Sequence, residues 1–282
     1  MTSPVTSPDN LQFVKMHGAG NDYVYVDGFD QPLPGDITQL ARDVSDRHTG
    51  IGSDGLILIL PPSTGEADVR MQMFNADGSE GSMCGNGMRC VAKYAVDSGR
   101  VNNHPLRVET ASGIKVIEVQ RGPDGKVETA TVDMGEPAVG PEAVKASGKL
   151  GILESEAHAL VSMGNPHAVI YVEHIDDIDL PSDGPRFTEH PAVPGGINTH
   201  FVEVISPAKV IISHWERGSG PTLACGTGAC AVCVAGVVTG RTERELEADV
   251  PGGTLHLRWD KQSNHVFMTG PAVEVFRGTW TL

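Results

Sequence analysis

Basic side chains are scarce in this sequence. Its 282 residues contain 21 Lys and Arg against 36 Asp and Glu, which gives a formal net charge of −15. This balance repels the phosphate backbones of nucleic acids and the acidic surfaces of membranes, and the sequence has no local basic cluster that would offset it. We therefore expect no nucleic-acid partner and no membrane partner.

Long apolar runs and export signals are also lacking. The longest apolar run, Ala229 to Val238, includes Gly236 and is about half as long as a membrane-spanning helix needs to be. The first residues, Met1 to Asn10, have neither the basic flank nor the apolar stretch of a signal peptide, and we expect a loose tail there. Five cysteines, an odd number, favour reduced thiols in the cytoplasm over a disulfide framework.

An internal repeat divides the chain. Cys84-Gly85-Asn86-Gly87 and Cys225-Gly226-Thr227-Gly228 are separated by 225 − 84 = 141 residues, half of the chain length. Over the 17 positions that start at these cysteines, seven residues are identical, against roughly one expected from average residue usage. We expect two homologous domains: residues 11–127, to which a C-terminal strand at 272–282 returns, and residues 128–271.

Each half shows short alternating or β-branched runs bounded by Gly and Pro, which is typical of strands. One helix follows each repeated turn, at 88–98 and 229–239, and ends at a glycine suited to a left-handed C′ position, Gly99 or Gly240. The second helix is apolar on every face, so we expect it to be buried and wrapped by sheets. The segment 180–196, rich in Pro and Gly, is predicted to be a long loop. These patterns predict an α+β fold.

The repeated turn has a definite chemistry. A cysteine at a helix N-terminus lies where unpaired backbone N–H groups and the helix dipole favour a thiolate, so we expect a lowered thiol pKa. The glycines after Cys84 and Cys225 let those N–H groups approach a carboxylate. If the halves pack about a pseudo-twofold axis, the two thiols face one cleft. Proton abstraction on one side of a carbon and donation on the other would then invert it.

Other interpretations of these residues remain. Cys225, Cys230 and Cys233 have a plant-type iron–sulfur spacing, but the fourth cysteine is absent and the last two lie in an apolar helix, where thiols are ordinary core residues. The histidines and cysteines show no paired spacing of a zinc site, so we expect no metal. His167 would suit nucleophilic Cys–His catalysis, although duplication favours two acid/base thiols.

A charged pair follows a predicted strand in the second half. Glu216 and Arg217 form either a solvated surface pair or part of a binding site. Arg217 is suited to bind a second carboxylate through two parallel hydrogen bonds.

Several ordered segments resemble the diaminopimelate epimerase family. They are Lys15 to Asp22, Asp46 to Gly52, Phe74 to Glu80, Met83 to Arg89, Met163 to His167, Trp215 to Gly218 and Ala224 to Ala229. The resemblance extends from about Phe13 to the end of the chain. It implies cofactor-free interconversion of LL-2,6-diaminopimelate and meso-diaminopimelate, on the route to lysine and cell-wall peptide. It also implies a homodimer whose subunits have two domains, each a mostly antiparallel sheet curled around a central helix.

The same resemblance assigns residues. Cys84 and Cys225 match the two acid/base thiols, and His167 and Glu216 match groups that tune them. The carboxylate cradle corresponds to Gly85, Asn86, Gly226 and Thr227, and the other substrate-binding positions to Asn21, Asn75, Asn165, Asn198, Glu216 and Arg217. The sequence departs from the family at Gly55, where some members carry Gln, and at Pro194 to Ile197, where a charged approach to Asn198 is usual.

Two alternatives to this function stay open at the level of sequence. A cofactor-independent racemase acting on proline-like substrates would have no use for a second carboxylate-binding residue such as Arg217. The alternative from a different class is a non-catalytic thiol or iron–sulfur binding protein, which an ultraviolet-visible spectrum would distinguish because a cluster absorbs visible light.

Overall fold

The computed structural model describes residues 9–282. We expected a loose tail at residues 1–10. Residues 1–8 lie outside the described part of the chain. Asn10, however, begins a β-strand and pairs with Thr281 of the last strand. The described residues form two compact units, one of residues 9–132 and 271–282 and the other of residues 133–270.

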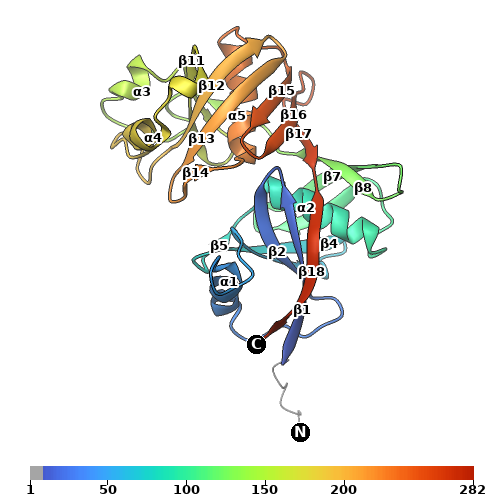
Figure 1. Ribbon diagram of the computed structural model, residues 1–282. Helices are drawn as coiled ribbons and strands as arrows, with labels where there is room; N and C mark the ends of the chain where they lie inside the picture. Colours follow the sequence, from blue (N-terminus) through green and yellow to red (C-terminus); the bar gives the residue numbers. More distant parts are fainter. Residues whose placement is uncertain (1–8) are drawn as a thin grey trace. The chain divides into compact units, whose positions relative to one another are not determined.

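The first unit is built from strands around one central helix (Figure 1). Its elements in chain order are β1 (Asn10–Gly18), β2 (Asn21–Asp27), α1 (Ile37–Ser45), β3 (Gly55–Leu60), β4 (Val69–Asn75), β5 (Glu80–Gly81), α2 (Gly85–Asp97), β6 (Leu106–Thr110), β7 (Gly113–Arg121), β8 (Val127–Asp133) and the returning β18 (Val273–Thr281). Helix α2 packs against β1, β2, β4, β6 and β7.

The second unit has the same plan. Its elements are β9 (Ala138–Val139), α3 (Ile152–Ser155), β10 (Ala159–Ser162), β11 (Pro166–Val172), the 3₁₀ turn η1 (Ile175–Asp177), α4 (Leu180–Thr188), β12 (Asn198–Ser206), β13 (Lys209–Glu216), β14 (Gly220–Thr222), α5 (Gly226–Val238), β15 (Glu245–Val250), β16 (Gly253–Trp259) and β17 (Val266–Pro271). Helix α5 packs against β10, β11, β12, β15 and β16.

The two units share one order of strand pairing. In the first, β1–β2 is antiparallel, β2–β3 parallel, β3–β4 antiparallel, β4–β6 parallel and β6–β7 antiparallel. In the second, β10–β11, β11–β12, β12–β13, β13–β15 and β15–β16 follow the same succession. The α+β class with mostly antiparallel sheets is confirmed, and strands can be compared one to one between the units.

Both predicted central helices are confirmed and begin three residues earlier than expected, at Gly85 and Gly226. Each is followed by a glycine with positive φ, +71° at Gly99 and +70° at Gly240, which is the backbone conformation that ends a helix at C′. Helix α5 is buried on every face, as its apolar sequence predicts.

The predicted loop at 180–196 is wrong in its first half, which forms helix α4. Pro181 stands in the first turn, where a missing N–H costs nothing, but Pro185 lies inside the helix. Packing outweighs this cost, because Phe187 is buried and its ring centroid lies 6.0 Å from that of Phe201. Helix α1 and strands β1 and β15 were also not predicted from the sequence.

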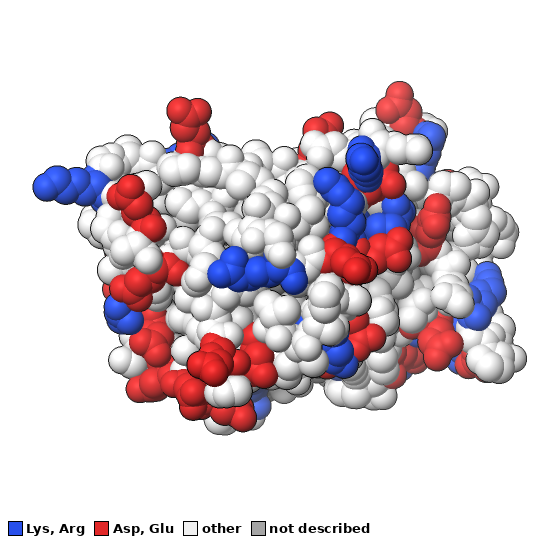
Figure 2. All heavy atoms as spheres, turned by 90° about the horizontal axis from the view of Figure 1, so that it is seen from above, with Lys and Arg blue, Asp and Glu red and all other residues white. Residues whose placement is uncertain are grey.

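The surface carries both signs of charge. Figure 2 shows acidic side chains scattered over the face it presents, with basic side chains between them. Many of the Arg and Lys groups form ion pairs, such as Lys209 with Glu247 and Asp249. Within residues 9–282, each helix is shorter or more polar than a membrane crossing requires.

Candidate active site

Cys84 caps the N-terminus of α2 with its side chain. Its Sγ accepts a hydrogen bond from the Gly87 N–H at 3.3 Å, and its S–H donates to Asn21 Oδ1 at 3.2 Å. The half-buried thiol also has a hydrogen bond with the Tyr23 side chain. Asn21, expected only as a substrate-binding residue, thus contacts the Cys84 thiol.

A charged network holds Asn21 in place. Asp54 Oδ2 accepts from Asn21 Nδ2 at 2.7 Å and from the Asp22 N–H at 3.0 Å. Arg47 donates to Asp22 at 2.8 Å and to Asp54 at 2.9 Å. Because both acids and the arginine share these bonds, the Asn21 carbonyl is fixed toward the thiol.

Sequence reasoning missed Tyr23 as a site residue. It stands three residues after Gly20, and His167 stands three residues after Gly164, so alignment of the two turns would have found it. The Tyr23 ring also explains Gly55, because a Cβ there would lie 2.8 Å from Tyr23 Cε1 and 2.1 Å from the Phe74 carbonyl oxygen. No side chain fits at Gly55 in this structure.

Cys225 has a different environment at the start of α5. Its thiol donates to Glu216 Oε2 at 2.9 Å, and Thr227 Oγ1 lies 3.7 Å from the sulfur. The Thr222 hydroxyl donates to the other oxygen of Glu216 at 2.6 Å. The backbone of Gly228, in the first turn of α5, also has a hydrogen bond to Cys225, so Glu216 and the helix both contact the sulfur.

The expectation of lowered thiol pKa values is wrong for this structure. Burial raises the pKa of Cys84, and burial together with the Glu216 carboxylate raises the pKa of Cys225 well above its ordinary value. The backbone N–H groups of the first turn act in the opposite direction but do not outweigh desolvation. Both cysteines are thus thiols at rest, and the one that acts as a base must first lose its proton.

Three buried histidines extend away from the second site. His167 Nδ1 lies 2.9 Å from His200 Nε2, and His200 Nδ1 lies 2.8 Å from His214 Nδ1. At the other end, His167 Nε2 lies 2.9 Å from Asn165 Oδ1, while Asn165 Nδ2 donates to Thr227 at 3.3 Å. Since an amide oxygen only accepts, the network assigns the His167 proton to Nε2.

All three imidazoles are neutral. Burial lowers the pKa of His167 and of His214 to about 3, and it moves the pKa of His200 in the same direction. An unfolded histidine titrates near pH 6.5. Between about pH 3 and pH 6.5 these histidines are protonated in the unfolded chain but not in the folded one. Their contribution to the free energy of unfolding is therefore fully present above about pH 6.5 and is lost as the pH falls below it.

This linkage gives a testable slope. We expect the free energy of unfolding to fall below pH 6.5 by up to about 1.4 kcal/mol per pH unit for each of the three histidines. His214→Met removes one of these histidines. Between about pH 5 and 6.5, the slope of its free energy of unfolding against pH should therefore be smaller than that of wild type by the contribution of one histidine. Urea unfolding at fixed pH values, with a chelator present, measures both slopes. Equal slopes would show that His214 takes up a proton in the folded state.

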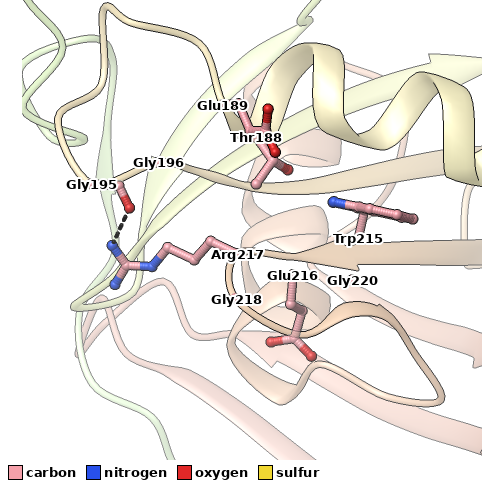
Figure 3. Close-up of a pocket in the computed structure, with 9 residues that line it drawn as sticks. All are labelled: Thr188, Glu189, Gly195, Gly196, Trp215, Glu216, Arg217, Gly218 and Gly220. Atoms are coloured by element: carbon pink, nitrogen blue, oxygen red, sulfur yellow. Dashed lines mark hydrogen bonds between the residues drawn. The ribbon is translucent and has the colours of Figure 1, made fainter.

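A pocket of about 400 Å³ lies beside the Glu216-Arg217 pair (Figure 3). Its lining residues are Thr188, Glu189, Gly195, Gly196, Trp215, Glu216, Arg217, Gly218 and Gly220. Figure 3 shows Arg217 reaching toward the Gly195 carbonyl oxygen, to which its Nη1 donates at 3.3 Å, while Glu216 points in another direction. The loop before Asn198 thus contacts the arginine.

The remaining predicted residues are distributed as follows. Asn198 is buried, and its Oδ1 accepts from the Arg217 N–H at 3.0 Å, which fixes the backbone at the arginine. Asn86 Oδ1 accepts from Arg89 Nη1 at 2.9 Å. Asn75 is exposed and donates to Ser79 at 3.0 Å within its own turn. Gly85, Gly226 and Thr227 occupy the first turns of the two helices.

The two repeated glycines differ in what surrounds them. A Cβ on Gly228 would lie 2.3 Å from His200 Cε1, in a buried ring, whereas a Cβ on Gly87 would lie 2.6 Å from Ile57 Cδ1, the flexible end of a side chain. We expect Gly228→Ala to reduce the free energy of unfolding by about 1–3 kcal/mol through overpacking. Gly87→Ala should cost less, because Ile57 can turn away. Urea unfolding of the two variants tests this, and an equal loss would contradict it.

Solved structures share this fold. A PhzF-family phenazine biosynthesis protein from Bacillus anthracis aligns with a TM-score of 0.71 and 17% identity, covering 98% of this chain and 100% of that one. A hydroxyproline epimerase from Agrobacterium vitis, solved with trans-4-hydroxy-L-proline, aligns with a TM-score of 0.66 and 17% identity, covering 98% and 92%. The chain therefore has the two-unit fold found in these proteins, and the thiols at its two helix starts suit an isomerase.

Sequence comparison defines the family. The family model for diaminopimelate epimerase matches residues 13–139 and 159–275. Diaminopimelate epimerases from Desulfovibrio desulfuricans and Acetivibrio thermocellus are 52% and 49% identical; they cover 96% and 95% of this chain, which covers 98% of each. The chain belongs to the diaminopimelate epimerase family.

Proposed function

We propose that this chain interconverts LL-2,6-diaminopimelate and meso-diaminopimelate in lysine and cell-wall precursor biosynthesis, with Cys84 and Cys225 as the acid/base pair. The observation that carries the mechanism is the recurrence of one arrangement in both units. In each, a thiol stands at the first turn of a central helix and donates to a polar partner, Asn21 or Glu216. A nucleophile is needed once, whereas inversion by two bases needs two such groups.

The chemical step is a balanced proton exchange. One cysteine, as thiolate, takes the proton from the α-carbon, and the thiol of the other gives its proton to the opposite face. The substrate is inverted, and the two cysteines have exchanged protonation states. Since both are thiols at rest, one proton must leave before the reaction. The Glu216 carboxylate, 2.9 Å from Cys225, is placed to accept it or to pass it on.

The first turns of α2 and α5 supply the binding energy for the reacting carboxylate. The helix's own hydrogen-bond ladder does not use the N–H groups of its first turn, which here belong to Gly85 and Asn86 and to Gly226 and Thr227. Negative charge that develops on the carboxylate during proton removal is stabilised there by these N–H groups and by the helix dipoles. This stabilisation increases in the transition state, which is the requirement for catalysis.

The distal end of the substrate is assigned to the pocket beside Arg217. Arg217 is exposed and therefore accessible to a carboxylate, with its backbone held by Asn198. Asn21, Asn75 and Asn165 complete the polar contacts. A proline-type substrate has no second carboxylate, so this pocket favours diaminopimelate over the racemase alternative.

The assembly and location are part of the proposal. We infer a homodimer from the family resemblance, and a cytoplasmic enzyme because all five cysteines are free, which suits a reducing compartment. Sedimentation velocity tests the dimer.

The activity has a direct test. Purified protein is incubated with LL-diaminopimelate without added cofactor, and the stereoisomers are separated by chiral chromatography. Appearance of the meso isomer, with no turnover of L-proline, is expected. An ultraviolet-visible spectrum of the same sample tests the iron–sulfur alternative, because a cluster absorbs visible light. Racemisation of proline, or a visible band with no epimerisation, would contradict the proposal.

A further inference from the structure

The second unit carries histidines where the first carries other side chains. Ile57 lies against the first turn of α2 at Gly87, and His200 lies against the first turn of α5 at Gly228. Their antiparallel partners are Met73 and His214 respectively. On the preceding strands, Tyr23 and His167 occupy matching places after the conserved turn of the repeat, Gly20 and Gly164. The same three positions of the fold therefore hold Tyr23, Ile57 and Met73 in the first unit and three histidines in the second.

The histidine set is the more costly one to bury. An imidazole taken from water loses hydrogen bonds that an isoleucine or methionine never had. His200 recovers both of its bonds, but His214 Nε2 has no hydrogen-bond partner among the described residues. The first unit shows that Ile and Met fill these places, so packing alone does not require three imidazoles.

These imidazoles converge with the Cys225 thiol. One ring nitrogen of His167, one of His200 and the Cys225 sulfur all lie within 4.8 Å of one another. The spacing along the chain concealed this cluster, because its members come from β11, β12 and the cap of α5. Zn²⁺ bound at about 2.0–2.1 Å to nitrogen and about 2.3 Å to sulfur holds such donors roughly 3.3–3.6 Å apart, so a movement of about 1 Å completes the geometry.

We propose that His167, His200 and Cys225 form an inhibitory site for a thiophilic divalent cation such as Zn²⁺. Binding converts the Cys225 thiol to a metal-bound thiolate and releases its proton to solvent. Only the inhibition rests on the proposed function, since a metal-bound Cys225 cannot exchange a proton with substrate. The cation is an inhibitor here and not a cofactor of the reaction.

The surroundings favour Cys225 over Cys84 as the metal ligand. Among the described residues, Cys225 lies in a group with two imidazoles that could hold a metal ion, and Cys84 lies in no such group. Cys225 also has a carboxylate neighbour, Glu216, whose Oε2 lies 2.9 Å from its sulfur. The corresponding neighbours of Cys84 are Asn21 and Tyr23, which are poor ligands for a soft ion.

Both histidines of the proposed site are ready to bind. A metal binds a ring nitrogen that carries no proton, and because His167 Nε2 donates to Asn165 Oδ1, the Nδ1 of His167 is such a nitrogen. His200 lies between His167 and His214, so its ring can give one nitrogen to the metal and keep a hydrogen bond to His214 through the other.

The test uses Cd²⁺ as a spectroscopic substitute for Zn²⁺. Metal-free protein is titrated with Cd²⁺, and the ultraviolet sulfur-to-cadmium charge-transfer band is recorded. We expect one equivalent to saturate the band in wild type and in Cys84→Ala, and no band at one equivalent in Cys225→Ala. This readout needs no activity, so its failure is distinct from failure of the proposed function. A band that is lost in Cys84→Ala and kept in Cys225→Ala would overturn the assignment.

The first unit provides matched variants for the histidines. His200→Ile copies Ile57 and should weaken Cd²⁺ binding by at least about tenfold, because losing a supporting contact to a ligand already costs about 10–100-fold. His214→Met copies Met73 and removes only the hydrogen bond that supports His200, so it should weaken Cd²⁺ binding less than His200→Ile does. Circular dichroism checks the fold of both. Equal affinity in His200→Ile and wild type would overturn the site whatever the result for His214→Met.

Inhibition completes the test in the active enzyme. Zn²⁺ should inhibit epimerisation by wild type, and added substrate should raise the concentration of Zn²⁺ that is needed. A chelator should restore activity. Zn²⁺ that binds with the predicted ligands yet leaves epimerisation unchanged would overturn the inhibitory role.

Discussion

Cys84→Ala and Cys225→Ala are each expected to reduce kcat for epimerisation by at least about 10³-fold, because each removes either the acid or the base for one direction of proton transfer. The double variant should be almost no worse than either single one, since the two groups act as a unit. Steady-state rates from chiral chromatography of LL- and meso-diaminopimelate in both directions measure these losses.

The chain provides three matched controls for these substitutions. Cys90, Cys230 and Cys233 are fully buried in α2 and α5, and their conversion to Ala should change stability while leaving kcat within a few-fold. Circular dichroism and urea unfolding separate the two effects. Wild-type kcat in either Cys84→Ala or Cys225→Ala would end the two-thiol mechanism.

Arg217→Met is expected to reduce kcat/KM for diaminopimelate by about 10²-fold or more. The substitution keeps much of the side-chain length but removes the charge and the hydrogen bonds that we assign to the distal carboxylate. A substrate carboxylate left unpaired in a bound complex loses a charged hydrogen bond and pays its desolvation, which explains the size of the effect. The comparison is between diaminopimelate and a 2-aminoheptanoate-type analogue without the distal carboxylate.

Arg217→Met should lower kcat/KM for diaminopimelate but not for the analogue. The analogue should be a poor substrate for wild type and equally poor for Arg217→Met. Arg186→Met is the control, because Arg186 is another exposed arginine of the same unit, paired with Glu156 and Asp183; it should retain wild-type kcat/KM. An equal loss for both substrates in Arg217→Met would remove this residue from distal recognition.

The repeated turn made much of the site predictable. Cys84, Cys225 and the helices they precede are local features, as are Gly99 and Gly240 at the helix ends, and sequence spacing reports local geometry well. The link of Glu216 to a thiol came from the family resemblance, and in the structure Cys225 donates to its carboxylate at 2.9 Å.

What the sequence could not show depends on strand register and burial. His200 pairs with His214 across β12 and β13, and His167 contacts His200 from β11. Spacing along the chain therefore does not reveal that the three histidines are in contact. The direction of the thiol pKa shift also failed, because a sequence shows the helix N-terminus but not the desolvation that opposes it. Helix α4 was missed because Phe187 gains more by packing on Phe201 than Pro185 loses.

Deuterium incorporation during the first turnovers tests the two-thiol mechanism most directly. LL-Diaminopimelate is converted in D₂O and the reaction is stopped at a few per cent. The mechanism predicts one α-deuterium in each meso product, because the donating thiol has exchanged with solvent, and none in the recovered substrate, because the abstracted proton lies on the other face. Product that keeps the substrate's own α-hydrogen would show a single base acting on both faces and would contradict the account.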